Sequence, residues 1–213
     1  MRTKCKCGKT KDLNGFCDGS HAKKSRKTIY YLLALFAFIT FASANLMSQE
    51  TVDLSNSNVF WKAYKVAGEH EGRIDLKQAD LTFEDGQLSG GIFVINMMSI
   101  VCTDLSGEYK QKLEGHLKSE DFFNVSKFPE ASLEIINVSQ KRNVLNIVAD
   151  ITIKEITERI SFQANISNDF IISNIKIDRS VFDVRYGSSS FFDNLGDNLI
   201  YNEFDITVKL NLK

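Results

Sequence analysis

The C-terminal stretch FDITVKLNLK, residues 204–213, alternates strictly between apolar and polar side chains. In a β-strand every second side chain lies on the same face, so this pattern predicts a strand with one face in a hydrophobic interior and the other in water. Shorter alternating runs occur at residues 151–154 and 175–178. The body of the protein is therefore expected to consist mainly of β-strands.

Turn-forming residues separate the alternating stretches. Asp85-Gly86 follows the apolar run 81–83 and precedes another, and this pair suits the two-residue turn of a β-hairpin. Other turn signals fall at residues 141–143, 167–169 and 194–197. Roughly eight short strands with such turns indicate an all-β antiparallel barrel or sandwich, and closure is favoured because the long final strand would otherwise be an exposed edge. We predict an eight-stranded barrel with one helical link, for which residues 108–118 and 119–124 are the helical segments.

The charges divide the chain into a basic head and an acidic body. Residues 1–27 hold nine Lys or Arg against two Asp, a net charge of +7, which leaves −8 for the rest because the whole chain carries −1. An acidic body argues against a nucleic-acid partner. We divide the chain into a head (1–27), a membrane or signal segment (28–49) and a barrel (50–213).

Residues 28–49 form an uncharged run of 22 residues after a basic stretch. About 20 apolar residues suffice to cross a bilayer, so the run predicts a single transmembrane helix with a cytoplasmic N-terminus and the barrel in the periplasm or outside the cell. Ala42-Ser43-Ala44 also fits a signal-peptide cleavage site, which would release the barrel into the periplasm. Both interpretations predict export.

The head contains Cys5, Cys7, Cys17 and His21 in the pattern Cys-x-Cys-x9-Cys-x3-His. Three thiolates and one imidazole are ligands suited to an iron–sulfur cluster or to zinc. With the string Cys-Asp-Gly-Ser-His at 17–21, the head resembles the CDGSH iron–sulfur family. The resemblance implies a [2Fe–2S] cluster on these four residues, with zinc as the alternative, and it leaves open whether the head forms a homodimer.

The body contains no recognisable catalytic arrangement, because the G-x-S-x-G elbow, the Walker loop and the H-E-x-x-H motif are all missing from the sequence. We therefore predict that the protein is not an enzyme. His70 and His116 are expected to be structural hydrogen-bonding residues, and Cys102 a small buried apolar residue.

Longer strings in the body carry a second resemblance. They are HLKSEDFF at 116–123 and RYGSSSFFDNLGD at 185–197, together with the segments 61–72, 88–97 and 127–129. The body resembles the YceI family of exported bacterial proteins over residues 50–213. This resemblance implies a lipocalin-like barrel that encloses an isoprenoid chain, either a polyprenyl lipid or the tail of a quinone.

Apolar residues that share a face of each predicted strand are the candidates for contact with such a chain. They are Phe83, Phe93, Ile95, Met97, Leu133, Ile135, Ile151, Ile153, Phe162, Phe204, Ile206 and Val208. The helical link, residues 108–123, is expected to cover one mouth of the barrel. Alternation alone does not distinguish a hollow barrel from one filled by its own side chains. Two other functions remain open, an electron-transfer protein that couples the head to membrane quinone and an exported stress protein without a ligand.

Overall fold

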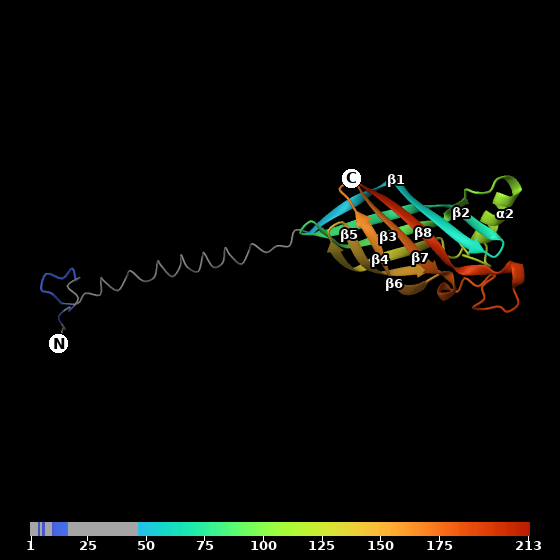
Figure 1. Ribbon diagram of the computed structural model, residues 1–213. Coiled ribbons are helices and arrows are strands. Elements are labelled where there is room, and N and C mark those ends of the chain that lie inside the picture. The colour runs from blue at the N-terminus through green and yellow to red at the C-terminus, as the bar shows by residue number, and fades with distance from the viewer. Residues whose placement is uncertain (1–3, 5, 7–9, 17–46) are drawn as a thin grey trace. The chain divides into compact units, whose positions relative to one another are not determined.

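The computed structural model describes residues 4, 6, 10–16 and 47–213 (Figure 1). The chain forms two units, residues 1–45 and 46–213. Within the first unit Lys4 and Phe16 form an antiparallel bridge, and Thr10 Oγ1 donates a hydrogen bond of 2.6 Å to the Phe16 carbonyl. The predicted ligands Cys5, Cys7, Cys17 and His21 lie outside the described residues, as do 28–46 of the predicted membrane segment. None of the helices in the described part of the chain has the length and apolar character needed to cross a membrane.

The second unit is a closed barrel of eight antiparallel strands in sequence order, in which β1 pairs with both β2 and β8 (Figure 1). The strands are β1 (Met47–Lys65), β2 (Gly68–Glu84), β3 (Gln87–Cys102), β4 (Glu130–Lys141), β5 (Val144–Ile153), β6 (Ile156–Ile166), β7 (Phe170–Asp178) and β8 (Ile200–Leu212). This confirms the predicted all-β, eight-stranded barrel. Strand β1 begins at Met47, slightly before the predicted domain boundary at residue 50.

Two hairpin turns have the backbone geometry of primed turns. Asp85 and Gly86 both have positive φ values, 50° and 76°, as the sequence predicted for the β2–β3 connection. The β5–β6 turn is formed by Lys154 and Glu155, also at positive φ (50° and 63°), although neither is glycine, asparagine or aspartate. Because an L-residue with a bulky side chain is strained in this region, the β5–β6 turn carries a local energetic cost.

The helical link contains a single helix, α2 (Gly107–Lys118), between β3 and β4. The helix predicted at 119–124 was wrong, because these residues form turns. Asn124 has a φ of 48°, and its amide donates to the Ser119 carbonyl at 2.7 Å, which closes a tight turn in place of a continued helix. Two short 3₁₀ helices, η2 (Arg179–Phe182) and η3 (Gly196–Asn198), lie between β7 and β8.

Alternation of buried and exposed residues positions the interior. In β5 the side chains of Leu145, Ile147, Ala149, Ile151 and Ile153 are buried, and the residues between them are more exposed. Buried residues form two clusters, one toward the α2 end of the barrel and one toward the end with the β2–β3 hairpin. In β5 the interior face is therefore the one that the apolar period predicts.

One glycine permits a close approach in the wall. Gly72 pairs with Trp61 across β1 and β2, and a Cβ at residue 72 would lie 2.6 Å from the indole and 1.9 Å from the Val101 carbonyl oxygen. Only glycine fits there, so the indole packs directly against the backbone at residue 72. Trp61 Nε1 is buried and has no hydrogen-bond partner within the described residues.

Candidate functional site

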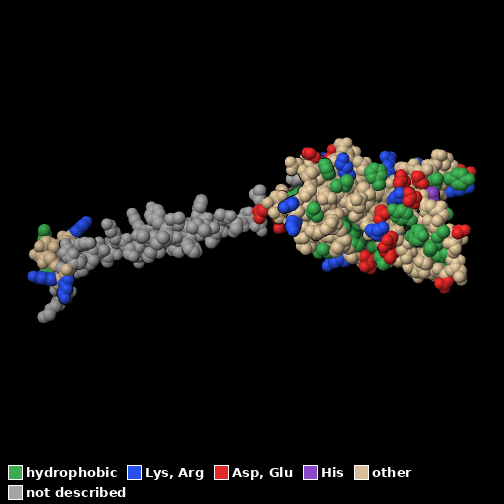
Figure 2. All heavy atoms as spheres, in the orientation of Figure 1, with side chains coloured by type: hydrophobic (Ala, Val, Ile, Leu, Met, Phe, Trp, Pro, Cys, Tyr) green, Lys and Arg blue, Asp and Glu red, His purple; other side chains and the backbone are tan. Residues whose placement is uncertain are grey.

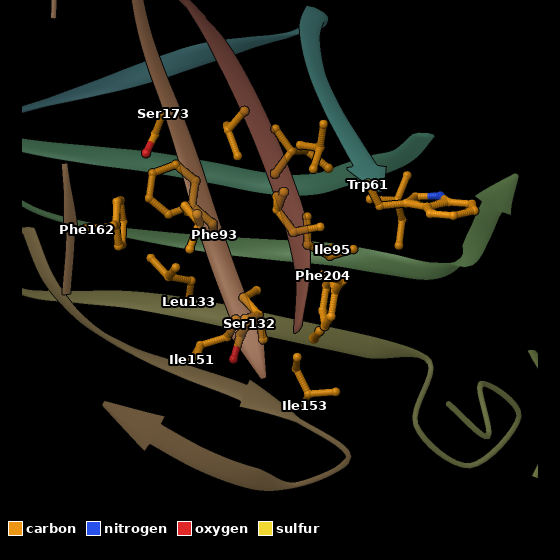
Figure 3. Close-up of a pocket in the computed structure, with 18 of the residues that line it drawn as sticks. Trp61, Phe93, Ile95, Ser132, Leu133, Ile151, Ile153, Phe162, Ser173 and Phe204 are labelled. Atoms are coloured by element: carbon orange, nitrogen blue, oxygen red, sulfur yellow. The ribbon is translucent and has the colours of Figure 1, made fainter. Parts of the chain in front are cut away.

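The barrel encloses an internal cavity of about 200 Å³ (Figure 3). All eight strands contribute to its wall, and Leu117 and Phe122 of the helical link lie at one end. On β8 the wall extends from Ile200 to Leu210. About ten steps between neighbouring strand residues, at roughly 3.3 Å each and tilted by roughly 40° in a barrel, correspond to a length of about 25 Å along the axis. The cavity is therefore elongated, which suits a chain better than a compact ring.

Eleven of the twelve side chains predicted to contact an isoprenoid lie on this wall. They are Phe93, Ile95, Met97, Leu133, Ile135, Ile151, Ile153, Phe162, Phe204, Ile206 and Val208. In Figure 3 Phe93, Leu133 and Phe162 come from three different strands and point toward one another across the interior. Phe83 is buried but does not line the cavity, because it lies at the last inward-facing position of β2 and packs in the cluster at the hairpin end. That these residues contact a ligand remains a prediction.

The wall consists almost entirely of hydrocarbon. The polar side chains among its residues are those of Ser132, Ser173, Arg179 and Tyr201, besides the indole N–H of Trp61. Ser173 Oγ donates to the Gln163 carbonyl at 2.7 Å, so this hydroxyl is already satisfied by the protein. A wall of this kind binds by excluding water from apolar surface and offers a ligand few polar contacts.

Arg179 is the one charged residue on the wall and is 2% exposed. Its guanidinium donates to the carbonyl oxygens of Val184 (2.7 Å), Ile200 (3.0 Å) and Tyr201 (3.2 Å). Burial lowers the pKa of Arg179 to about 10, although the charge of Asp178 acts in the opposite direction. The side chain therefore stays protonated at neutral pH and ties the segment after β7 to the start of β8.

The helical link contributes an aromatic group at the α2 end. The Phe122 ring lies 5.0 Å from the Phe123 ring and 5.6 Å from the His116 ring, and the Arg179 guanidinium stacks over it at 5.4 Å. Burial lowers the pKa of His116 against the opposing charge of Asp121, so the imidazole is neutral near pH 7. Leu117, Phe122 and Phe123 line the cavity, which places the link where the sequence predicted a cover.

Cys102 belongs to a hydrogen-bonded group outside the cavity wall. Its Sγ donates to Asp104 Oδ1 at 2.9 Å, and His70 Nδ1 contacts the other oxygen of Asp104 at 2.8 Å. Burial and then the bond to Asp104 raise the pKa of the Cys102 thiol, which is fully buried as the sequence predicted. Burial also opposes ionisation of Asp104, but the hydrogen bonds from Cys102, His70 and the Glu71 amide outweigh it and hold its pKa at about 2. The group joins β2 to the loop after β3.

Sequence reasoning missed several wall residues. Ile175 and Ile177 belong to an alternating run that was recognised but not assigned to the cavity, so the signal for them was present. Arg179 gave no signal, because a charged residue at the end of a strand usually lies in water. Trp61 was part of a family-like string, but its place on the wall depends on the absence of a side chain at Gly72.

The outer surface of the barrel carries many charged side chains, in contrast to the apolar cavity wall. On the face shown in Figure 2, acidic and basic side chains are interspersed with small apolar patches. Within the residues that the structure describes, no three His, Cys, Asp or Glu side chains are grouped so that they could hold a metal ion. The internal cavity is therefore the feature of the barrel from which function is best argued.

Comparison with known proteins agrees with this architecture. The YceI-like domain matches residues 51–212. The crystal structure of Burkholderia cenocepacia BcnA has a TM-score of 0.63 and 18% identity, over 76% of this chain and 99% of that one. A polyisoprenoid binding domain from Saccharophagus degradans, implicated in plant cell wall breakdown, has a TM-score of 0.55 and 12% identity, over 78% and 98%. A search of curated proteins finds no match. Since the family match covers most of the chain, the protein belongs to the YceI-like domain family.

Proposed function

We propose that the barrel binds a polyisoprenoid lipid or the isoprenoid tail of a quinone, and that it acts as a binding protein without a catalytic step. The observation that supports this most directly is the elongated cavity with its hydrocarbon wall. The Saccharophagus degradans domain of similar fold is described as polyisoprenoid binding, which favours the same ligand class here. Removing apolar surface from water contributes about 25 cal/mol per Å², so an extended branched hydrocarbon can bind without any polar contact.

Lipid extraction from the purified full-length chain, followed by mass spectrometry, tests this function. The expected result is a polyprenyl species in near-stoichiometric amount, retained through size-exclusion chromatography. Native mass spectrometry of the same sample should show the complex and the empty protein separated by the mass of that species. Recovery of only phospholipids or straight-chain fatty acids, with no binding of added geranylgeraniol, would refute the assignment.

We also propose that the barrel is exported and remains tethered through residues 28–49, with release after cleavage near Ala44 as the alternative. The uncharged run and the basic residues before it support this. N-terminal sequencing of the mature protein from membrane and periplasmic fractions distinguishes a retained anchor from cleavage near Ala44. A chain that starts at Met1 in the membrane fraction indicates an anchor, and one that starts at Asn45 indicates cleavage.

For the head we propose a [2Fe–2S] cluster on Cys5, Cys7, Cys17 and His21. The described part of the head supports a closed loop, because the Lys4–Phe16 bridge joins the residues that directly precede Cys5 and Cys17 in the sequence. Such a cluster would supply one-electron chemistry, and the head would then be suited to exchange electrons with membrane quinone. Visible absorbance of the full-length protein, altered by His21→Ala, would support this role. A colourless protein that contains zinc would contradict it.

A further inference from the structure

The seam between β6 and β7 is incomplete. Only Ala164–Ile166 of β6 pair with Ile171–Ser173 of β7, although β6 begins at Ile156 and β7 ends at Asp178. On their other sides both strands are paired along most of their length, β6 with β5 and β7 with β8. Residues 156–163 and 174–178 therefore face each other without a hydrogen-bonded ladder. We call this stretch the β6–β7 seam.

Side chains fasten the β6–β7 seam at its edge alone, within the residues that the structure describes. Arg159 on β6 forms its two hydrogen bonds, both 2.8 Å, with Asp150 on β5. On β7 Lys176 contacts Asp205 of β8 at 3.0 Å, and Asn174 accepts from Thr207 of β8 at 2.8 Å. These outward-facing groups bond away from the seam. At its edge Ser173 Oγ of β7 donates to the Gln163 carbonyl of β6 at 2.7 Å. Apart from this bond, no side-chain hydrogen bond or ion pair joins the described residues of the seam, so beyond Gln163 the strands can separate without breaking such contacts.

The β6–β7 seam borders the cavity directly. Ile175 and Ile177 of β7 line the wall. So do Phe162 of β6 and Ser173 of β7, which is the last β7 residue of the ladder (Figure 3). Glu158 pairs with the wall residue Ile151, so it occupies an inward-facing register position, yet it is exposed. An inward-facing charge is a device that protects an unpaired strand edge from pairing with another chain. The inner face of β6 thus reaches solvent beside the seam.

The two ends of the barrel are more firmly closed. At the α2 end Leu117, Phe122 and Val125 are buried. At the same end the Arg179 guanidinium donates hydrogen bonds to three backbone carbonyl groups. At the hairpin end Leu81, Phe83 and Leu88 belong to the second buried cluster. A lipid that entered along the axis would have to disrupt one of these clusters.

We propose that the β6–β7 seam is a lateral portal through which the isoprenoid chain enters and leaves the barrel. The proposal rests on the proposed lipid-binding function and adds the route that the ligand takes. A sideways opening lets a long chain enter along its length instead of being threaded from one end. The three remaining backbone pairs, Ala164–Ile166 with Ile171–Ser173, act as the hinge side of the portal.

A cross-link across the seam tests this route. Continuing the Ala164–Ser173 register places Ser161 opposite Lys176, and both are exposed. The full-length chain with Cys5, Cys7 and Cys17 replaced by serine would carry Ser161→Cys and Lys176→Cys and be joined by a short bismaleimide. The matched control joins Ser139→Cys and Asn146→Cys, an exposed pair already bonded between β4 and β5. Trp61, the single tryptophan and a wall residue, reports loading by its fluorescence after mixing with geranylgeraniol.

If the seam is the portal, its cross-link should slow loading of geranylgeraniol by about tenfold or more relative to the same variant before cross-linking, as expected for a gated site. The control cross-link should leave the loading rate unchanged. Equal loading rates before and after the seam cross-link would overturn the portal and leave lipid binding intact. Failure of the unmodified wild-type chain to bind geranylgeraniol would instead remove the proposed function.

A second measurement requires no substitution. In the empty wild-type protein, hydrogen–deuterium exchange should be fast at those amides of residues 156–163 and 174–178 that point into the seam, since the alternate amides bond to β5 and β8. Exchange should be slow at the amides that bond β4 to β5, and loading should slow exchange at the seam. Exchange at the seam that is as slow as in β4–β5 would contradict an open portal.

Discussion

Filling the part of the cavity toward its α2 end should weaken lipid binding without unfolding the barrel. Ala131 lies on the wall, opposite Ile95 in the β3–β4 pairing, and is partly exposed to the void. In Ala131→Phe the added ring projects into space that the ligand would occupy. Because this space is empty in the absence of ligand, the ring fills a void instead of displacing packed side chains.

The size of the effect follows from the apolar contact that the ring displaces. One isoprene unit has five carbons, and a buried methylene contributes about 0.8 kcal/mol, so exclusion of one unit costs at most about 4 kcal/mol. Rearrangement of a flexible chain around the ring reduces this to about 2–4 kcal/mol, which corresponds to roughly 30- to 700-fold weaker binding. The free energy of unfolding of the empty protein should stay within about 1 kcal/mol of the wild-type value or increase.

Titration of geranylgeraniol against Trp61 fluorescence measures the affinity, and urea unfolding measures the stability. Ala67→Phe is the matched control, because Ala67 is exposed in the β1–β2 turn and the same ring added there touches no cavity. Wild-type affinity in Ala131→Phe, in a protein that unfolds cooperatively, would refute the claim that the ligand occupies the part of the cavity beside Ala131.

Three further predictions concern the scaffold. Glu155→Gly should raise the free energy of unfolding by about 1 kcal/mol in urea titrations, because glycine adopts the positive φ of this turn without strain; no gain would show that Glu155 is unstrained. Arg179→Met should lower the free energy of unfolding by about 3 kcal/mol, because three carbonyl groups lose their hydrogen-bond donor. A loss below about 1 kcal/mol would contradict this bonding role. Asp104 has a pKa lowered from 3.8 to about 2, so its contribution to the free energy of unfolding is fully present above pH 4 and is lost as the pH falls toward 2. Asp104→Asn should therefore flatten the dependence of the free energy of unfolding on pH between pH 4 and 2. An unchanged pH dependence would contradict the assigned hydrogen bonds.

The apolar period in the sequence was sufficient to predict the barrel and most of its interior. Strand β8 shows why, because Phe204, Ile206 and Val208 alternate with polar residues and a strand with this pattern can bury only one face. The Asp85-Gly86 turn was predictable for a similar local reason. Each of these features depends on neighbouring residues in the chain.

Features that depend on distant residues were not predictable in the same way. Whether the interior is hollow depends on how side chains from eight strands fit together, and alternation reports only which face is inward. Phe83 and Phe93 have the same local pattern, yet Phe83 fills the hairpin end and Phe93 faces the void. The second predicted helix, at 119–124, failed because Asn124 adopts a left-handed conformation that closes a turn. The β6–β7 seam likewise depends on where two strands diverge in space.

A crystal structure of the full-length protein grown with geranylgeraniol would test the central claim most directly. A lipid-binding barrel should show continuous, branched electron density along its axis, in contact with Phe93, Leu133 and Ile151 and surrounded by the hydrocarbon wall. Ordered water throughout the cavity, or a barrel collapsed so that its own side chains close the space, would contradict it.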